Sequence, residues 1–222
     1  MTTEQLRHRM SPILKALKER SLRGRTPVEG LRRTECAYHG WDTVHADAAS
    51  WEPFAPGDAF GGLEAHHCFK GTVTLPEASA GKRVVCLVST GASDIWNNNN
   101  PQFLAYVDGR LVCGLDVNHN EFDLAACAVP GESHELALYV YCNTPARDVF
   151  LRVETAERDD DVTGLYYDLR APYEVCALLA DDDTRAIGIM KHLNRALNLL
   201  DLRDLDSGAF AQSVRDAREY LR

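Results

Sequence analysis

The chain has 222 residues and a net charge of −9, with 45% apolar and 26% charged residues. These proportions predict one folded domain, or one domain with an extension, and argue against a disordered chain. The first 33 residues hold nine Lys and Arg against three Asp and Glu, so the rest of the chain is strongly acidic, which argues against nucleic acid as a partner because phosphate binding depends on cationic side chains.

Residues 1–34 are predicted to form an amphipathic helix and a basic linker. Within QLRHRMSPILKALKER, apolar residues recur three and four positions apart, the spacing of one helix face. They are Leu6, Met10, Ile13, Leu14 and Leu17. Ser11 before Pro12 is typical of an N-cap and a first-turn proline, so we expect the helix to begin or kink there.

Residues 35–172 are predicted to form a β-sandwich, because short strand-like stretches alternate with turn residues and no helix lies between them. The stretches are HHCFKGTVTL, KRVVCLVST, FLAYV, RLVCGLDV, NEFDLA, HELALYVYC, FLRVETAE and GLYYDLRA. The clearest hairpin is at YVDGRLV, where Asp108-Gly109 supplies the two positive-φ positions of a tight turn.

Residues 173–222 return to helical periodicity and are predicted to form two helices. The first presents Ile187, Met190, Leu193, Leu197 and Leu200 on one face, and the second presents Phe210, Val214, Ala217 and Leu221. We expect caps near Asp183-Thr184 and Asp206-Ser207. The acidic runs 159–161 and 181–183 suit solvated loops or helix starts.

The seven cysteines are an odd number without a CxxC pair, and most lie in apolar runs. This usage indicates reduced, buried thiols rather than a disulfide scaffold. The N-terminus has no apolar signal region, and no apolar run is long enough to span a bilayer. We therefore expect a soluble cytoplasmic protein with no membrane partner.

A first candidate site is Glu64 to Cys68, which holds a carboxylate, two histidines and a cysteine. On a strand, His66 and His67 point to opposite faces and cannot chelate one ion together. Glu64, His66 and Cys68 would share a face and could begin a zinc site, although packed or hydrogen-bonded structural residues are the commoner outcome. We expect one histidine to be buried with a hydrogen-bond partner and the other to face outward.

A second candidate is LDVNHNEFDL, where Asp116, His119, Glu121 and Asp123 could serve acid–base chemistry of the kind that glycoside hydrolysis needs. The alternative is a polar loop between strands in which Asn and Asp bind nearby backbone groups. A third candidate is SDIWNNNNPQ. There Trp96 could cover the C–H surface of a sugar while Asn97, Asn98 and Asn100 meet its hydroxyls, unless these residues are simply turn formers.

Several collinear stretches resemble the N-terminal region of bacterial and vacuolar-type α-mannosidases of glycoside hydrolase family 38. They are WEPFAPGDAFGGLEAHHCFKGTVTLPE, NPQFLAYVDGRLVCGLDVNHNEFDLA, HELALYVY, LYYDLRAPYEVCALL, LNRALNLLDLR and SVRDAREYL. NPQFLAYVDG with GLDVNH is the most specific part. The sequence departs from the family pattern at Cys68, where an aromatic residue is common, and at DIWNNNNPQ, where a compact glycine-rich loop is common.

The resemblance implies a jelly-roll β-sandwich, similar to galactose-binding-like modules, with an N-terminal helix and a C-terminal helical segment: a mainly β fold with flanking helices. It also implies a separate catalytic domain, which would hold the zinc and the catalytic residues. This chain lacks the His-x-His-x-Asp type motif that opens that domain, so the resemblance transfers no catalytic residue, and no cofactor is expected here.

We therefore expect a non-catalytic accessory module of an α-mannosidase that acts as scaffold, oligomer contact or substrate-approach element. Its expected partners are a catalytic domain or subunit, mannose-containing glycans and further copies of itself. One alternative is an autonomous carbohydrate-binding module that uses Trp96, the asparagines, Asp116 and His119. A more distant alternative is a small metalloenzyme built on Glu64, His66 and Cys68.

Overall fold

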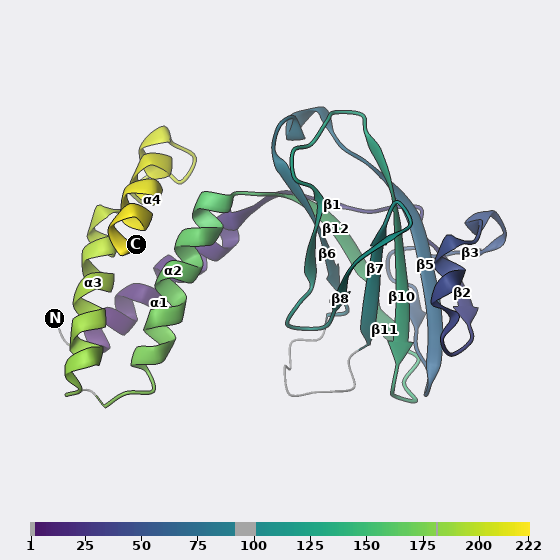
Figure 1. Ribbon diagram of the computed structural model, residues 1–222, viewed down its shortest axis with the longest axis horizontal. Coiled ribbons are helices and arrows are strands. Elements are labelled where there is room, and N and C mark those ends of the chain that lie inside the picture. Colours follow the sequence, from purple (N-terminus) through teal and green to yellow (C-terminus); the bar gives the residue numbers. More distant parts are fainter. Residues whose placement is uncertain (1–2, 92–100, 181) are drawn as a thin grey trace. The chain divides into compact units, whose positions relative to one another are not determined.

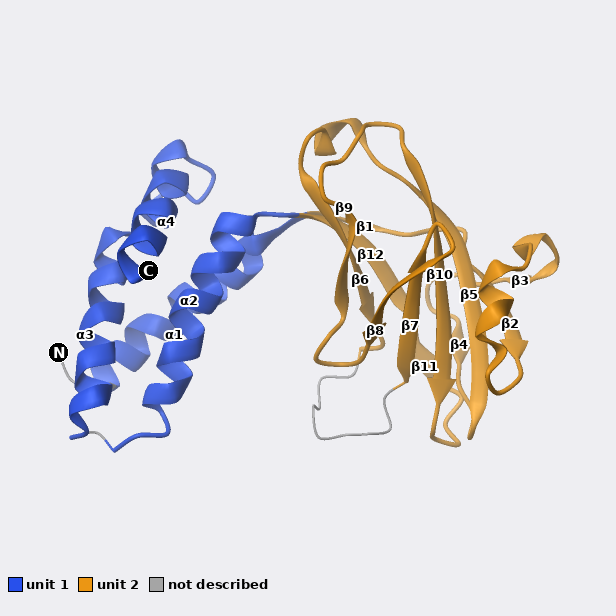
Figure 2. Ribbon diagram, in the orientation of Figure 1, with its two compact units in different colours: residues 1–23, 158–222 blue, residues 24–157 orange. Residues whose placement is uncertain are grey.

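The computed structural model describes residues 3–91, 101–180 and 182–222 (Figure 1). The chain divides into two compact units, shown in Figure 2. One unit joins residues 1–23 to residues 158–222, and the other comprises residues 24–157. These units differ from the three consecutive segments expected from the sequence, 1–34, 35–172 and 173–222, because both ends of the chain contribute to one helical core.

The helical unit contains four helices: α1 Thr3–Ser21, α2 Asp160–Cys176, α3 Thr184–Leu199 and α4 Gly208–Leu221. Their apolar faces form one core, with its most deeply buried side chains at Leu6, Met10, Leu165, Leu169, Leu193, Ala196, Val214 and Ala217. Both faces predicted for the C-terminal helices contribute to this core, although Ile187 on the first face is exposed.

Helix α1 begins at Thr3 and continues through Pro12. The prediction that the helix starts at Ser11 is therefore wrong. Leu6 and Met10 precede the proline and Ile13 and Leu17 follow it, and all four are buried in one core. A helix that started at Ser11 would leave the first two out of this stripe. The burial of the complete stripe therefore offsets the backbone hydrogen bond that a proline removes.

The predicted caps of the C-terminal helices are confirmed. Asp183 accepts a hydrogen bond from the Arg185 N–H at the start of α3, and Ser207 accepts one from the Phe210 N–H at the start of α4. The acidic run 159–161 is also a helix start, since Asp159 caps α2.

The strand predicted at GLYYDLRA is wrong, because residues 164–171 lie inside helix α2. Leu165, Tyr166 and Leu169 bury one side of this helix. Tyr166 and Leu169 follow Leu165 by one and four positions. A helix gathers such positions on one face, whereas a strand divides them between two faces. Pro172, which suggested a boundary, lies within the helix.

The sandwich unit contains two larger sheets and one short strand pair. The four-stranded sheet has the order β1-β12-β6-β9, the six-stranded sheet has the order β3-β2-β5-β10-β7-β8, and β11 pairs with β4. The bounds are β1 Leu22–Pro27, β2 Arg32–Cys36, β3 Glu52–Pro53, β4 Ala59–Phe60, β5 Ala65–Thr74, β6 Arg83–Ser89, β7 Gln102–Val107, β8 Arg110–Leu115, β9 Glu121–Ala125, β10 Ser133–Cys142, β11 Val149–Phe150 and β12 Arg152–Arg158.

Alternate side chains of both larger sheets fill one core, as an antiparallel sandwich requires. Phe69, Leu138 and Phe103 enter it from the six-stranded sheet, and Cys86 and Val153 enter it from the four-stranded sheet. The expected fold class, mainly β with flanking helices, is therefore confirmed, while a jelly-roll strand order stays a prediction.

The hairpin predicted at Asp108-Gly109 is confirmed. Strands β7 and β8 pair on either side of it, and the two residues have φ values of 50° and 74°. The Asp108 carboxylate also accepts a hydrogen bond from the Glu135 N–H at 2.9 Å and contacts the His134 ring at 2.8 Å. The turn is thus fastened to β10. No helix among the described residues is long and apolar enough to cross a membrane.

Candidate functional site

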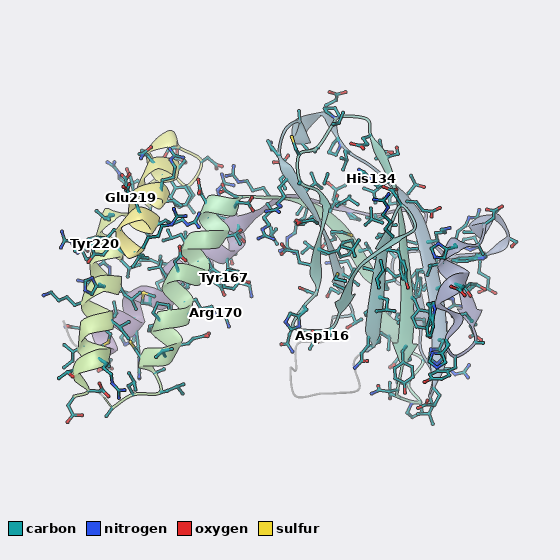
Figure 3. The ribbon with its side chains drawn as sticks, viewed as in Figure 1. Asp116, His134, Tyr167, Arg170, Glu219 and Tyr220 are labelled. Atoms are coloured by element: carbon teal, nitrogen blue, oxygen red, sulfur yellow. The ribbon has the colours of Figure 1, made fainter. Side chains whose placement is uncertain are left out.

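The outer face of the six-stranded sheet, the face turned away from the sandwich core, carries a groove of about 350 Å³. We call it the outer-face groove. It is lined by Gln102, Phe103, Leu104, Gly114, Leu115, Asp116, Tyr139 and Tyr141. These residues come from β7, from β8 and the position after it, and from β10, and Figure 3 labels Asp116 at one end of this region.

Strand register brings the outward-pointing residues of the groove together. Tyr141 pairs with Gln102, and Tyr139 pairs with Leu104, which in turn pairs with Gly114. Residues two apart on one strand share a face, so the two tyrosines stand next to each other. Gly114 has no side chain, and this leaves a hollow beside them.

Both tyrosines are held by hydrogen bonds that orient their rings. The Tyr141 hydroxyl donates to Glu64 Oε1 at 2.9 Å, and the Tyr139 hydroxyl lies 2.7 Å from Nδ1 of His66. The bond to Glu64 raises the pKa of Tyr141, and burial raises the pKa of Tyr139. Both phenols therefore stay protonated and can donate and accept hydrogen bonds near neutral pH.

Further aromatic side chains adjoin the tyrosines. The His66 ring lies 5.1 Å from Tyr141 and 5.5 Å from Tyr38, and the Trp41 ring lies 6.5 Å from Tyr139. Tyr38 and Trp41 are exposed by 70% and 41%. Exposed apolar side chains such as these two are typical of interaction surfaces, whereas Tyr139 is only 7% exposed and belongs to a buried cluster with Val44 and Trp51.

A covering segment lies over part of the outer face, where Tyr38 packs against His66. It includes the 3-10 helix Gly40–His45, and Lys70 on β5 donates to the Ala46 carbonyl at 2.9 Å. The expectation that His66 and His67 point to opposite faces agrees with their contacts. The expectation that one faces outward is wrong, because their exposed fractions are only 7% and 1%.

His67 points toward the core side, where its ring lies 5.5 Å from that of Phe60 and its Nε2 lies 3.4 Å from the Gly61 carbonyl. Burial lowers the pKa of His67, which favours the neutral ring. Gly61 itself has a φ of 126°, and a Cβ there would lie 2.5 Å from the Ala146 carbonyl oxygen. Close backbone approach therefore explains this glycine of the GDAFGGLEAHHCFKG stretch.

The structure gives Glu64, His66 and Cys68 different partners: Tyr141, Tyr139 and Cys36, respectively. Across the described part of the chain, no group of three or more His, Cys, Asp and Glu side chains is placed to hold a metal ion. The described residues thus offer no geometry for the zinc-site hypothesis.

Of the predicted sugar-binding residues, Asp116 lines the groove. Its carboxylate accepts hydrogen bonds from the Asn118 and His119 N–H groups, each at 2.7 Å, and it lies 3.2 Å from His119 Nδ1. Desolvation opposes ionisation, but these hydrogen bonds outweigh it and lower the pKa of Asp116. The carboxylate therefore orders its own loop, as the structural alternative expected, and also borders the groove.

The remaining predicted residues do not join the groove in the described structure. His119 is not among the lining residues, and its side chain is 80% exposed. Asp123 lies on β9 of the other sheet and pairs with Arg83 at 3.0 Å. Trp96, Asn97, Asn98 and Asn100 lie outside the described residues.

The sequence reasoning missed Tyr139, Tyr141, Gln102 and Leu104. A usable signal was present in ALYVYC, where two tyrosines alternate with apolar residues on a predicted strand. That pattern places both aromatic rings on the face opposite the core. The pairing of this strand with Gln102 and Leu104 could not be read from it.

No family model matches the sequence, and no curated protein matches it. Among solved structures, a β-glucuronidase from an uncultured Clostridium species is 8% identical with a TM-score of 0.43, over 61% of this chain and 29% of that one. The Faecalibacterium prausnitzii β-glucuronidase is 13% identical with a TM-score of 0.41, over 61% and 32%. The Bacteroides uniformis β-glucuronidase is 11% identical with a TM-score of 0.42, over 60% and 18%. This chain therefore spans a third or less of the proteins that it is similar to, and these scores do not place it in their family.

Proposed function

We propose that this chain is a non-catalytic accessory part of a glycoside hydrolase and that its sandwich unit binds carbohydrate in the outer-face groove. The observation that carries the proposal is the pair Tyr139 and Tyr141, which stand beside Gln102 and Asp116 over the hollow at Gly114. Carbohydrate presents C–H faces and a rim of hydroxyls. The groove offers aromatic rings to the C–H faces and polar side chains to the hydroxyls.

The chemistry of each wall supports this assignment. Aromatic rings cover apolar C–H surface while their hydroxyls remain able to bond. The Gln102 amide both donates and accepts, and the Asp116 carboxylate accepts from sugar hydroxyls. The hydrogen bonds to His66 and Glu64 fix the tyrosines before a ligand arrives, which lowers the entropic cost of binding.

The finer proposal is that the parent enzyme is an α-mannosidase of glycoside hydrolase family 38. It rests on the collinear sequence resemblance. The most specific stretches of that resemblance are NPQFLAYVDG and GLDVNH. They supply six of the groove residues: Gln102, Phe103, Leu104, Gly114, Leu115 and Asp116. Mannose-containing glycans and a zinc-bearing catalytic domain or subunit are the partners that this proposal names.

A scaffold or oligomer-contact role is the second candidate. It draws support from exposed apolar side chains on the helical unit: Tyr167 at 57%, Val175 at 49%, Leu178 at 87% and Ile187 at 51%. Large exposed apolar side chains are enriched at protein interfaces. Figure 3 labels Tyr167 on α2.

The sugar-binding proposal predicts saturable shifts of amide signals from β7, β8 and β10 when α-mannobiose is titrated and followed by NMR. Tyr141→Ala should weaken binding about two- to tenfold, since aromatic contacts contribute roughly 0.5–1.5 kcal/mol beyond their buried area. Tyr141→Phe keeps the ring and should retain most of the affinity.

Tyr167→Ala, an exposed tyrosine of the helical unit, is the matched control and should bind normally. Cellobiose and a uronic-acid disaccharide complete the panel. Binding of these two sugars without α-mannobiose would contradict the mannosidase proposal and leave the carbohydrate proposal standing. A panel in which no sugar shifts the groove signals would contradict both.

A further inference from the structure

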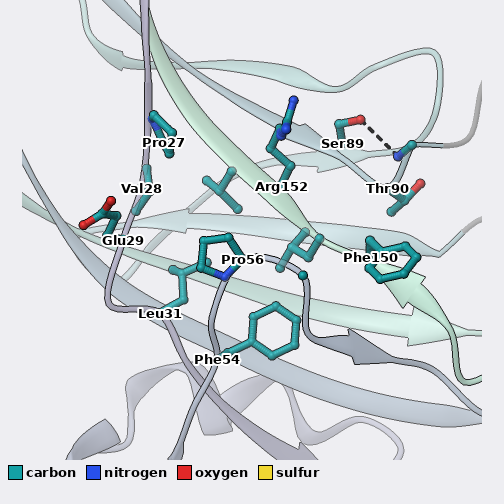
Figure 4. Close-up of a pocket in the computed structure, with 14 residues that line it drawn as sticks. Pro27, Val28, Glu29, Leu31, Phe54, Pro56, Ser89, Thr90, Phe150 and Arg152 are labelled. Atoms are coloured by element: carbon teal, nitrogen blue, oxygen red, sulfur yellow. Dashed lines mark hydrogen bonds between the residues drawn. The ribbon is translucent and has the colours of Figure 1, made fainter.

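The sandwich unit has a second hollow, of about 470 Å³, that the proposed function does not use. We call it the edge pocket, and Figure 4 shows it in close-up. It is lined by Pro27, Val28, Glu29, Leu31, Phe54, Pro56, Gly57, Ser89, Thr90, Gly91, Phe150, Leu151, Arg152 and Val153. None of these residues lines the outer-face groove, and the volume is in the range of small-molecule sites.

The apolar walls of the edge pocket are preformed. The Val28 N–H donates to the Val153 carbonyl at 2.9 Å, and the Phe54 N–H donates to the Leu31 carbonyl at 2.8 Å. These bonds tie the segments that carry the walls to one another. The Phe54 ring also packs edge-on against Phe69 with 4.9 Å between centroids, so its position is set by the core.

The polar groups of the edge pocket are few, and one of them is a cation. Arg152 is exposed and has no hydrogen-bond or ion-pair partner within the described part of the chain. In Figure 4 it lies between the side of the pocket formed by Val28 and the side formed by Ser89 and Thr90. The Ser89 hydroxyl accepts a bond from the Gly91 N–H at 3.2 Å.

We propose that the edge pocket binds a small organic anion with an apolar body, whose carboxylate pairs with Arg152. A guanidinium stays charged at every physiological pH and presents a planar set of donors that matches a carboxylate. The buried Val28, Leu31 and Leu151 side chains and the Phe54 ring would cover the apolar body. Glu29 also lines the pocket, and its negative charge disfavours a second anionic group on the ligand.

The test uses two fluorescent probes of similar shape on the full chain. One is 1-anilinonaphthalene-8-sulfonate, which is anionic, and the other is N-phenyl-1-naphthylamine, which is uncharged. Arg152→Gln should weaken the anionic probe about tenfold or more, the usual consequence of losing a charge-assisted bond. Arg152→Gln should leave the binding affinity for the uncharged probe nearly unchanged.

Two further variants locate the bound probe. Phe150→Ala removes an exposed wall residue and should weaken the binding of both probes. Tyr141→Ala, in the outer-face groove, should leave the binding of both probes unchanged. Arg110→Gln, on a different strand, is the matched charge control and should behave as wild type. Competition by 4-phenylbutyrate but not by 4-phenylbutanol then identifies the carboxylate as the recognised group.

If Arg152→Gln lowered the affinity for both probes equally, the site would be merely apolar, and the proposal would be overturned. Wild-type affinity for the anionic probe in Arg152→Gln would overturn it as well. Because the groove and the edge pocket share no residue, failure here leaves the carbohydrate proposal intact, and failure of that proposal leaves this one intact.

Discussion

Two thiols of the sandwich unit change each other's chemistry. Cys36 on β2 and Cys68 on β5 lie with their Sγ atoms 3.6 Å apart. The hydrogen bond from Cys68 lowers the pKa of Cys36, although burial opposes this effect. The same contact and burial raise the pKa of Cys68. Cys36 is therefore the thiol of the pair that ionises first, and it is also the more accessible one.

Cys68→Ala should slow alkylation of Cys36 by iodoacetamide at neutral pH, because the thiolate of Cys36 loses its hydrogen-bond donor and thiolate is the reacting form. The pH midpoint of the reaction, followed by mass spectrometry of the Cys36 peptide, should move upward.

The control for the Cys36 measurement is Cys142→Ala, which removes another buried thiol from the sandwich core and should leave the rate at Cys36 unchanged. A Cys36 rate that responds equally to both substitutions would mean that general loosening, rather than the thiol contact, controls its reactivity.

The histidine pair shows what could be predicted at a single residue. Alternation along a strand is a local property, so it correctly separated His66 from His67. The burial of His66 depends on Tyr38 and Tyr139, which pack against its ring and are distant from it in sequence. A pattern of neighbouring residues contains no information about such a cover.

Among the elements, the β7–β8 hairpin depends on the ionised carboxylate of its turn. The hydrogen bond to His134 lowers the pKa of Asp108 from its ordinary value of 3.8, with the Glu135 N–H adding to the effect. A carboxyl whose pKa is depressed by folding stabilises the folded state above its unfolded pKa. This contribution is lost as the pH falls through the lower, folded value.

Asp108→Asn should therefore lower the free energy of unfolding at neutral pH by less than about 1 kcal/mol, because the Asp108 side chain is 53% exposed and solvent screens the pair. The difference from wild type should shrink as the pH falls below 3.8, measured by urea unfolding at a series of pH values. Asn-Gly remains a good turn sequence, so the hairpin itself is kept.

In a His134→Gln background, Asp108→Asn should lower the free energy of unfolding at neutral pH by less than it does in the wild-type chain. A difference between Asp108→Asn and wild type that stays constant from pH 7 to pH 3 would contradict the role assigned to the carboxylate.

Element types were predictable where local chemistry and the tertiary fold agree. Asp108-Gly109, Asp183 and Ser207 show this, since turn and cap geometry depend on a few adjacent residues. Residues 164–171 show the opposite case. Their tyrosines and the following Pro172 favoured a strand. The structure has helix α2 there, because a helix buries both Leu165 and Leu169 against the other helices. The outer-face groove could not be predicted from local sequence either, because it is formed by strands that pair across long sequence separations.

At the scale of the whole molecule, each unit has its own apolar core. Leu165 is fully buried in the helical unit, and Leu138 is 1% exposed in the sandwich unit. Separate cores allow separate cooperative transitions. Two transitions are therefore expected in calorimetry.

Leu165→Ala should lower the free energy of unfolding of the helical unit by about 2–5 kcal/mol, the usual cost of a cavity of this kind. It should shift only one of the two calorimetric transitions. Leu138→Ala is the matched change in the sandwich and should shift the other. One transition that moves with both substitutions would show that the units unfold together.

The helical unit is completed by both ends of the chain, and this has a consequence during synthesis. Helix α1 leaves the ribosome before α2, α3 and α4, which emerge only after the whole of residues 24–157. At about 5–20 residues per second, the nascent α1 waits roughly ten seconds with its apolar stripe uncovered. The sandwich can meanwhile fold behind it, and during this interval Leu6, Met10 and Leu17 lack the core partners that they have in the folded helical unit.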